Sequence, residues 1–187
     1  EKDQDADEPG FFDEIERSNG ALGVVTKCLN EYNICVNEIT NFVNDANNKY
    51  GDIQAYQKQK FDFMGISMSS VSEKMDPIID EMEEMMAVHA SSFENILLMI
   101  DDIGSNELDS LSGLRDSLSE AVIGIGQFVD ASKNGLDATK NMPRLTQKFN
   151  VGKRSICNSM ERMIGVSQEM LNRFNEYISY INGYLKG

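Results

Sequence analysis

The sequence predicts an all-α protein, specifically an elongated, antiparallel, up-down-up-down four-helix bundle with coiled-coil-like packing. Apolar residues recur at steps of three and four over four long stretches, which is the spacing of one face of a helix. The connections between these stretches are short, so each helix must run back along the one before it. No alternating apolar runs are joined by a hairpin turn, so we expect no strands.

The first ten residues differ in composition from the rest of the chain. They contain five acidic side chains, one lysine, Pro9 and Gly10, but no large apolar side chain. Such a segment cannot bury enough apolar surface to fold. We therefore expect a flexible acidic linker over residues 1–10 and a single helical-bundle domain over residues 11–187, as one part of a larger protein.

The first periodic stretch predicts a helix over about residues 12–49. Its apolar residues follow a heptad seam with one gap, at Ser18. Gly20 and Gly23 each weaken the helix by about 1 kcal/mol relative to alanine, so a break or fraying is possible there. After a short turn, Asp52 is a good N-cap for the next helix.

The second stretch runs to about residue 103 and contains Pro77 near its middle. Proline removes one backbone hydrogen bond and clashes with the preceding turn, but the apolar spacing continues through it. We expect one long helix kinked near Pro77; the alternative is two helices, the second beginning at Asp76. The predicted seam consists of Met64, Met68, Val71, Met75, Ile78, Met82, Met85, His89, Phe93, Ile96, Ile100 and Ile103.

Two further helices are predicted after this one. The third covers about residues 106–140 and ends at Asn141 and Pro143. The fourth covers about residues 144–185, and its apolar face consists of two parallel rows, wider than a two-stranded seam needs. A bundle of several helices would bury this width.

The three cysteines do not have the spacing of a metal site or a disulfide framework. Cys28 and Cys35 lie on one predicted helix about 10 Å apart, too far for a disulfide, so we expect core thiols. With no Asn-x-Ser/Thr sequon, this favours the cytoplasm, although Cys157 could meet one of them from another helix. An extracytoplasmic sensor domain is the alternative. No apolar run approaches the roughly 18 residues of a membrane span, so we expect no membrane insertion by this segment.

The formal net charge is −14, but the charges are unevenly distributed. Residues 140–187 carry eight basic and three acidic side chains. The antiparallel topology would bring residues 46–60 and 133–154 to one end of the bundle, which would then be basic, and would leave the other end acidic. So acidic a chain, without aromatic side chains interleaved among the basic ones, is not expected to bind nucleic acid.

The basic end includes a possible partner-docking site. It could receive an acidic partner, a phosphate-bearing ligand or an anionic surface. The plainer interpretation is that these charges only keep the helices soluble, and helix C-termini favour cations in any case. The candidate residues are Lys140, Arg144, Lys148, Lys153 and Arg154.

The sequence offers no constellation for catalysis or for a cofactor. A di-iron bundle needs two histidines, and the chain has only His89, which we expect in the core with a hydrogen bond to a carbonyl or carboxylate. Gly124 and Gly126 lack the third glycine of a dinucleotide fingerprint and suggest a close helix approach or a bend. We expect no enzyme, no bound metal and no cofactor.

The leading interpretation is a non-enzymatic interaction or regulatory module that mediates protein–protein association or signalling, with a protein partner or self-association. The alternative is the ligand-sensing four-helix bundle of a membrane receptor, with a small molecule between the helices. A helical toxin or pore-forming component is a third interpretation. The eleven methionines fall mainly on seam positions, where they would fill the core or else line an adaptable groove.

Overall fold

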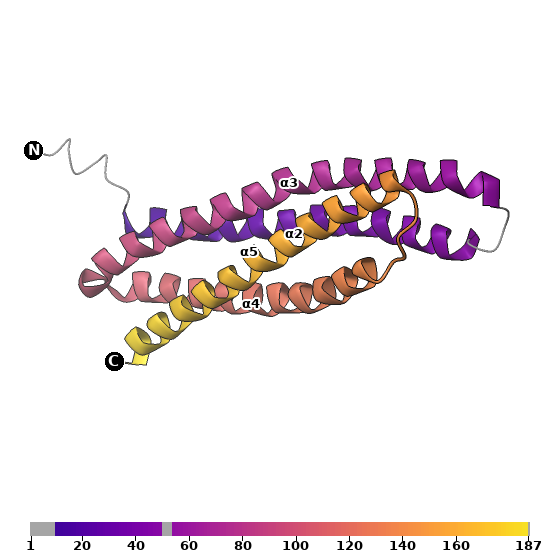
Figure 1. Cartoon of the computed structure of the whole chain (residues 1–187). Helices are drawn as coiled ribbons and strands as arrows, with labels where there is room; N and C mark the ends of the chain where they lie inside the picture. The colour runs from indigo at the N-terminus through magenta and orange to yellow at the C-terminus, as the bar shows by residue number, and fades with distance from the viewer. Residues whose placement is uncertain (1–9, 50–53, 187) are drawn as a thin grey trace, which may run out of the picture. The chain divides into compact units, whose positions relative to one another are not determined.

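The computed structural model describes residues 10–49 and 54–186, without the side chains of residues 43, 45–49 and 54–57. It contains α2 (Phe11–Lys49), α3 (Gln54–Met99), a 3-10 turn η1 (Ile100–Asp102), α4 (Ser105–Lys140) and α5 (Gln147–Lys186) (Figure 1). No strand occurs in the ranges described, so the predicted all-α four-helix fold is confirmed. Residues 1–9 of the linker expected over residues 1–10, and the expected N-cap Asp52, lie outside the described residues.

The glycines and the proline that could have interrupted helices do not do so. α2 continues through Gly20 and Gly23, and α3 is one helix through Pro77. The alternative of two helices meeting at Pro77 is therefore wrong, and the kink itself stays a prediction. Proline is tolerated at this position because the apolar residues before and after it keep the same helical spacing, and their packing holds the helix together.

α5 begins three residues later than predicted, at Gln147 instead of residue 144. Side chains that cap the helix explain the difference. Thr146 accepts a hydrogen bond from the Phe149 amide through its hydroxyl at 3.3 Å, which is the geometry of an N-cap. The Leu145 amide donates to Asn150 Oδ1 at 3.1 Å. Arg144 and Pro143 therefore belong to the connection between α4 and α5.

The chain forms two compact units, and each helix contributes one segment to each unit. Unit 1 comprises residues 1–27, 82–126 and 168–187, and unit 2 comprises residues 28–81 and 127–167. By sequence, unit 1 carries 19 acidic and 6 basic side chains, a net charge of −13, and unit 2 carries 12 and 11, a net charge of −1. The expectation of one domain over residues 11–187 stays a prediction.

In unit 1, α2 and α3 run antiparallel around a buried polar pair. Ser18 Oγ donates to Ser92 Oγ at 2.8 Å, and Ser92 Oγ donates to the Glu14 carbonyl at 2.7 Å. The gap at Ser18 in the predicted seam is thus filled by a hydrogen-bonded serine from the facing helix. The apolar core of this unit includes Phe11, Ile15, Leu22, Val25, Phe93, Ile96, Leu111, Leu114, Leu118, Met170, Phe174 and Ile181.

In unit 2, the parallel helices α3 and α5 touch directly. A Cβ on Gly65 would overlap the Lys148 carbonyl oxygen and lie 2.6 Å from the Phe149 Cα, and a Cβ on Gly152 would overlap the Gly65 carbonyl oxygen. Glycine at both positions permits this backbone contact. Methionines fill much of the surrounding core, as the core-filling interpretation expected: Met64, Met68, Met75, Met160 and Met163 are all buried.

Candidate functional site

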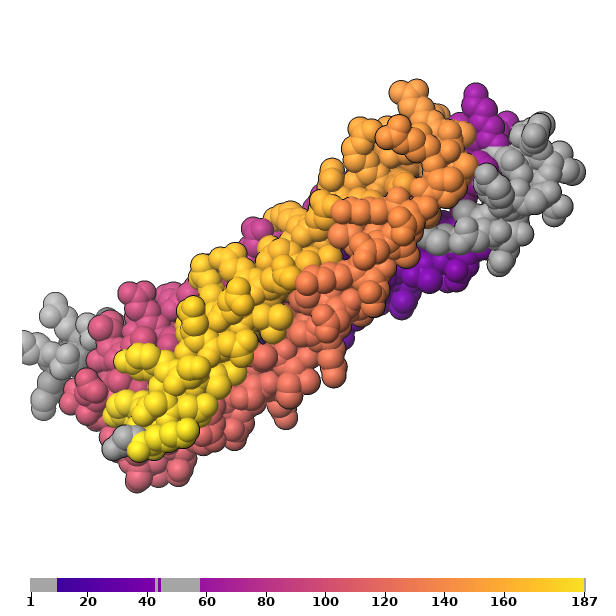
Figure 2. Space-filling view, turned by 60° about the horizontal axis from the view of Figure 1, so that its bottom comes forward, coloured from indigo at the N-terminus to yellow at the C-terminus, as the bar shows by residue number. Residues whose placement is uncertain are grey.

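All five residues of the predicted docking site belong to unit 2, at or beside the connection between α4 and α5. Lys140 is the last residue of α4, and Arg144 lies in the connection. Lys148, Lys153 and Arg154 follow on the first turns of α5. This region lies at the surface, where the start of α5 is light orange in Figure 2.

Three of the five residues line one open pocket. Arg144, Lys153 and Arg154 surround it together with Asn150 and Cys157, and its volume is about 240 Å³. No carboxylate is among the described residues that line it. We call this cavity the basic pocket. Three positively charged side chains around one cavity create a positive potential that attracts an anionic group.

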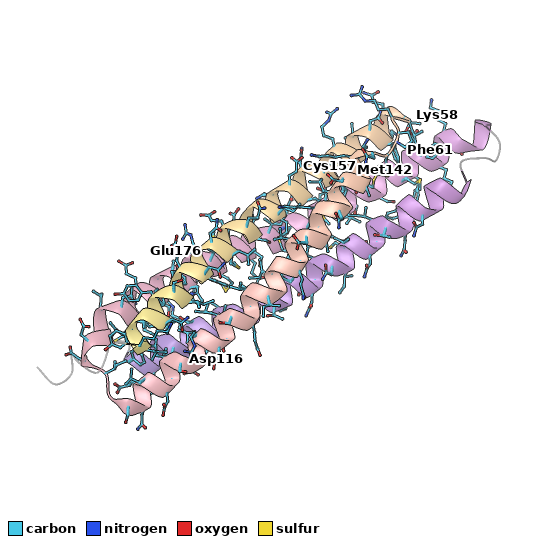
Figure 3. All side chains as sticks on the ribbon, turned by 90° about the horizontal axis from the view of Figure 1, so that it is seen from below. Lys58, Phe61, Asp116, Met142, Cys157 and Glu176 are labelled. Atoms are coloured by element: carbon cyan, nitrogen blue, oxygen red, sulfur yellow. The ribbon has the colours of Figure 1, made fainter. Side chains whose placement is uncertain are left out.

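Hydrogen bonds from α5 hold the α4–α5 connection against that helix. Asn150 accepts from the Leu145 amide, and Lys153 Nζ donates to the Met142 carbonyl. Met142 is buried beside α5, and Figure 3 labels it together with Cys157. These two contacts place Arg144 at the basic pocket, although Arg144 itself lies outside any helix.

The cations of the site are not equally available to a partner. Lys140 forms an ion pair with Glu161 at 2.7 Å, and hydrogen bonding to Glu161 raises the pKa of this lysine. Lys153 already donates to the Met142 carbonyl. Arg144, Lys148 and Arg154 have no carboxylate within ion-pair distance in the part of the chain that the structure describes, and all three are exposed.

Lys148 lines a second cavity, between α3 and α5 of unit 2. This groove has a volume of about 570 Å³ and is lined by Gly65, Ile66, Ser69, Ser70 and Glu73 from α3 and by Gln147, Lys148 and Val151 from α5. We call it the α3–α5 groove. Gly65, one of the two glycines at the close backbone contact, also lines the groove and has no side chain that could fill it.

The sequence did not reveal this groove, because the glycines expected to permit a close approach were different ones. A Cβ on Gly124 or Gly126 would meet nothing within 4 Å, so neither residue is at a close helix contact. The pair that does make contact, Gly65 and Gly152, lies on two helices distant in the sequence. Pairing α3 with α5 was the missing information, and no local signal gives it.

The three cysteines are free and buried, as expected for core thiols. Burial raises the pKa of the Cys157 thiol, with the nearby Lys153 acting in the opposite direction. Its neutral thiol is a poor nucleophile at neutral pH. Among the described residues no cluster of His, Cys, Asp and Glu side chains has the arrangement of a metal site.

His89 lies in the core of unit 1, as expected, but the hydrogen bond expected for it is wrong. Its ring is 1% exposed, and neither ring nitrogen has a hydrogen-bond partner among the described residues. Burial lowers the pKa of His89 to about 4, and an interaction with the residue's own backbone opposes this more weakly. The ring is therefore neutral at physiological pH and packs as an aromatic side chain.

No helix in the described ranges is both long and apolar enough to cross a lipid bilayer. Comparison with protein-family models, with curated proteins and with solved structures finds no match to this chain.

Proposed function

We propose that this protein is a non-enzymatic helical-bundle interaction module that docks an acidic segment of another protein at the basic pocket. The observation that carries the proposal is the pocket's lining: Arg144, Lys153 and Arg154 around one cavity, without a carboxylate, in a chain whose net charge is −14. Charges that served only solubility would be interspersed with carboxylates, as they are on much of this surface.

Elsewhere on the surface, several cations are paired with neighbouring carboxylates. Lys74 lies 3.7 Å from Glu38, Lys140 lies 2.7 Å from Glu161, and Arg162 forms an ion pair with Asp80. Exposed pairs of this kind contribute little to stability and leave little net field. The contrast with the basic pocket supports a role for the pocket in recognition. We place this module in the cytoplasm, where its three free thiols would stay reduced.

The test uses a fluorescently labelled peptide rich in aspartate and glutamate, titrated with the full chain at low and at physiological salt. We expect binding that weakens as salt screens the charges over about 10 Å at 0.1 M. The double variant Arg144→Glu/Arg154→Glu should weaken binding at low salt by at least about tenfold, because attraction becomes repulsion at the pocket.

The matched control is Lys74→Glu/Lys186→Glu, which makes the same change in net charge at exposed sites outside the pocket. It should bind the peptide nearly as the original chain does. Equal weakening in both variants would show that only total charge matters, and the docking proposal would be wrong. Circular dichroism and thermal unfolding establish that both variants keep the helical fold.

The volume of the α3–α5 groove favours a second candidate function, the ligand-sensing bundle. A groove of about 570 Å³ is within the size range of small-molecule sites, about 300–1,000 Å³. An apolar small molecule that bound there would raise the melting temperature. A thermal-shift screen with apolar compounds distinguishes the two functions, because an acidic-peptide docking module requires no such shift.

A further inference from the structure

We infer that the partner segment is amphipathic: it places a large apolar side chain in the α3–α5 groove and an acidic group in the basic pocket. This inference rests on the proposed function and names the chemistry of its partner. It adds a second anchor, chemically different from the first, on the same part of unit 2.

Both cavities lie along the same turns of α5. The groove is lined by Gln147, Lys148 and Val151, and the basic pocket by Asn150, Lys153 and Arg154. With 3.6 residues per turn, these two sets lie on neighbouring faces of the helix, about a third of a turn apart. From Gln147 to Cys157, the residues of α5 that line the two cavities span about 15 Å along the helix axis. One short peptide segment crossing α5 therefore reaches both cavities.

The groove presents apolar side chains that the fold leaves uncovered. Ile66 is 54% exposed and Val151 is 47% exposed, and they come from different helices but line the same cavity. Phe63, one helical turn before Ile66 on α3, is 65% exposed. Single exposed apolar side chains are common, but apolar residues gathered around one groove indicate a binding surface.

Charge selects the kind of occupant. The cations of the basic pocket attract an anion beside the groove, whereas the groove itself is lined by one lysine, Lys148, and one glutamate, Glu73, whose charges offset each other. A purely apolar ligand would leave the charge of the pocket unused, and a purely acidic one would leave Ile66 and Val151 exposed. An acidic amphipathic segment complements both. A second copy of this chain, with its net charge of −14, would meet overall repulsion.

The experiment selects binders from a random peptide library displayed on phage, with the full chain as immobilised target. We expect enriched peptides that carry both a large apolar residue and at least one Asp or Glu. The most enriched peptides are then synthesised and their affinity is measured for variants of the full chain. Ser69→Trp, which fills the groove, should weaken binding at least about tenfold, and so should Arg144→Glu/Arg154→Glu.

Ser91→Trp is the matched control, because it makes the same change at an exposed position of α3 that does not line the groove. It should leave affinity unchanged. If Ser69→Trp destabilises the fold, Ile66→Ser replaces it, with Leu98→Ser, at a position 79% exposed on the same helix, as its control. Removing one apolar wall of the groove should weaken binding severalfold without any large side chain being introduced.

The other outcomes separate this inference from the proposed function. Acidic peptides that need no apolar residue, and that bind Ser69→Trp normally, would overturn the amphipathic partner and leave acidic docking intact. Apolar peptides that bind Arg144→Glu/Arg154→Glu as well as they bind the original chain would overturn both the amphipathic partner and acidic docking. No enrichment, or self-association of the chain abolished by the same variants, would overturn the inference, and the acidic-peptide titration would then decide the proposed function alone.

Discussion

His89 stacks on Tyr177 in unit 1, with ring centroids 5.5 Å apart and ring planes 9° from parallel. The Phe174 ring lies 4.9 Å from His89 in a tilted arrangement, and Phe93 stacks on Tyr177 at 4.2 Å. An aromatic cluster therefore surrounds the only histidine of the chain and links α3 to α5 within this unit.

This environment predicts that the chain loses stability as the pH falls. The folded-state pKa of His89, about 4, is below the ordinary value near 6.5, so the unfolded state binds more protons between these values. The free energy of unfolding should fall as the pH drops from about 6.5 to about 4, by about 3 kcal/mol from this residue. Urea unfolding followed by circular dichroism at several pH values measures it.

His89→Phe separates this effect from the titration of the carboxylates. Phenylalanine keeps the aromatic packing and removes the titrating group, so the variant should lose about 3 kcal/mol less than the original chain over the same pH range. His89→Leu serves if the larger ring does not fit. An identical pH dependence in the variant and the original chain would show that His89 does not titrate at the expected pH.

The contact between Gly65 and Gly152 predicts that alanine destabilises the chain at these two positions but not at a glycine outside the contact. Gly65→Ala or Gly152→Ala should destabilise the chain by about 1–3 kcal/mol or more, because the added Cβ would overlap backbone atoms of the facing helix. Gly165→Ala is the matched control on α5, since a Cβ there would meet nothing within 4 Å. It should stabilise the helix by about 1 kcal/mol. Equal effects of Gly152→Ala and Gly165→Ala in urea unfolding would contradict the contact.

The apolar period was sufficient to predict the helices but not their partners. Helix number, order and approximate bounds follow from steps of three and four and from short connections, which are local properties. The seam of α3 was nevertheless placed one residue out of phase at one point: Ile79 is fully buried, whereas Ile78 is half-buried. Ile78 and Ile79 are adjacent and both apolar, so the sequence alone did not show which of the two belongs to the seam.

The basic pocket was partly predictable because its residues lie close together in the sequence. Arg144, Lys153 and Arg154 fall within one connection and the turns that follow it, so a short-range excess of charge identified them. The pairing of Lys140 with Glu161 depends on how α4 and α5 pack. The same is true of the α3–α5 groove, which exists only because residues some 80 positions apart meet.

The serine pair in unit 1 predicts non-additive effects of mutation. Ser92→Ala leaves the buried Ser18 hydroxyl without its acceptor and should cost about 1–3 kcal/mol. Ser18→Ala leaves Ser92 still donating to the Glu14 carbonyl and should cost only about 1 kcal/mol. The double alanine variant should cost less than the two single variants together. A double-mutant cycle from urea unfolding measures the coupling, and additive costs would mean that the two hydroxyls do not interact.

The buried thiols predict slow alkylation of the folded chain. Burial raises the pKa of Cys35 and of Cys157, so the reactive thiolate is scarce at neutral pH. Iodoacetamide at neutral pH should modify the folded chain far more slowly than the chain in urea, as mass spectrometry of the peptides would show.

Cys157 should react first among the three because it lines the open basic pocket. A bound acidic peptide should slow this reaction further by covering the pocket. Alkylation of Cys157 at the rate of the unfolded chain would contradict its burial, and earlier modification of Cys28 or Cys35 would contradict the assignment of the pocket as the open route to a thiol.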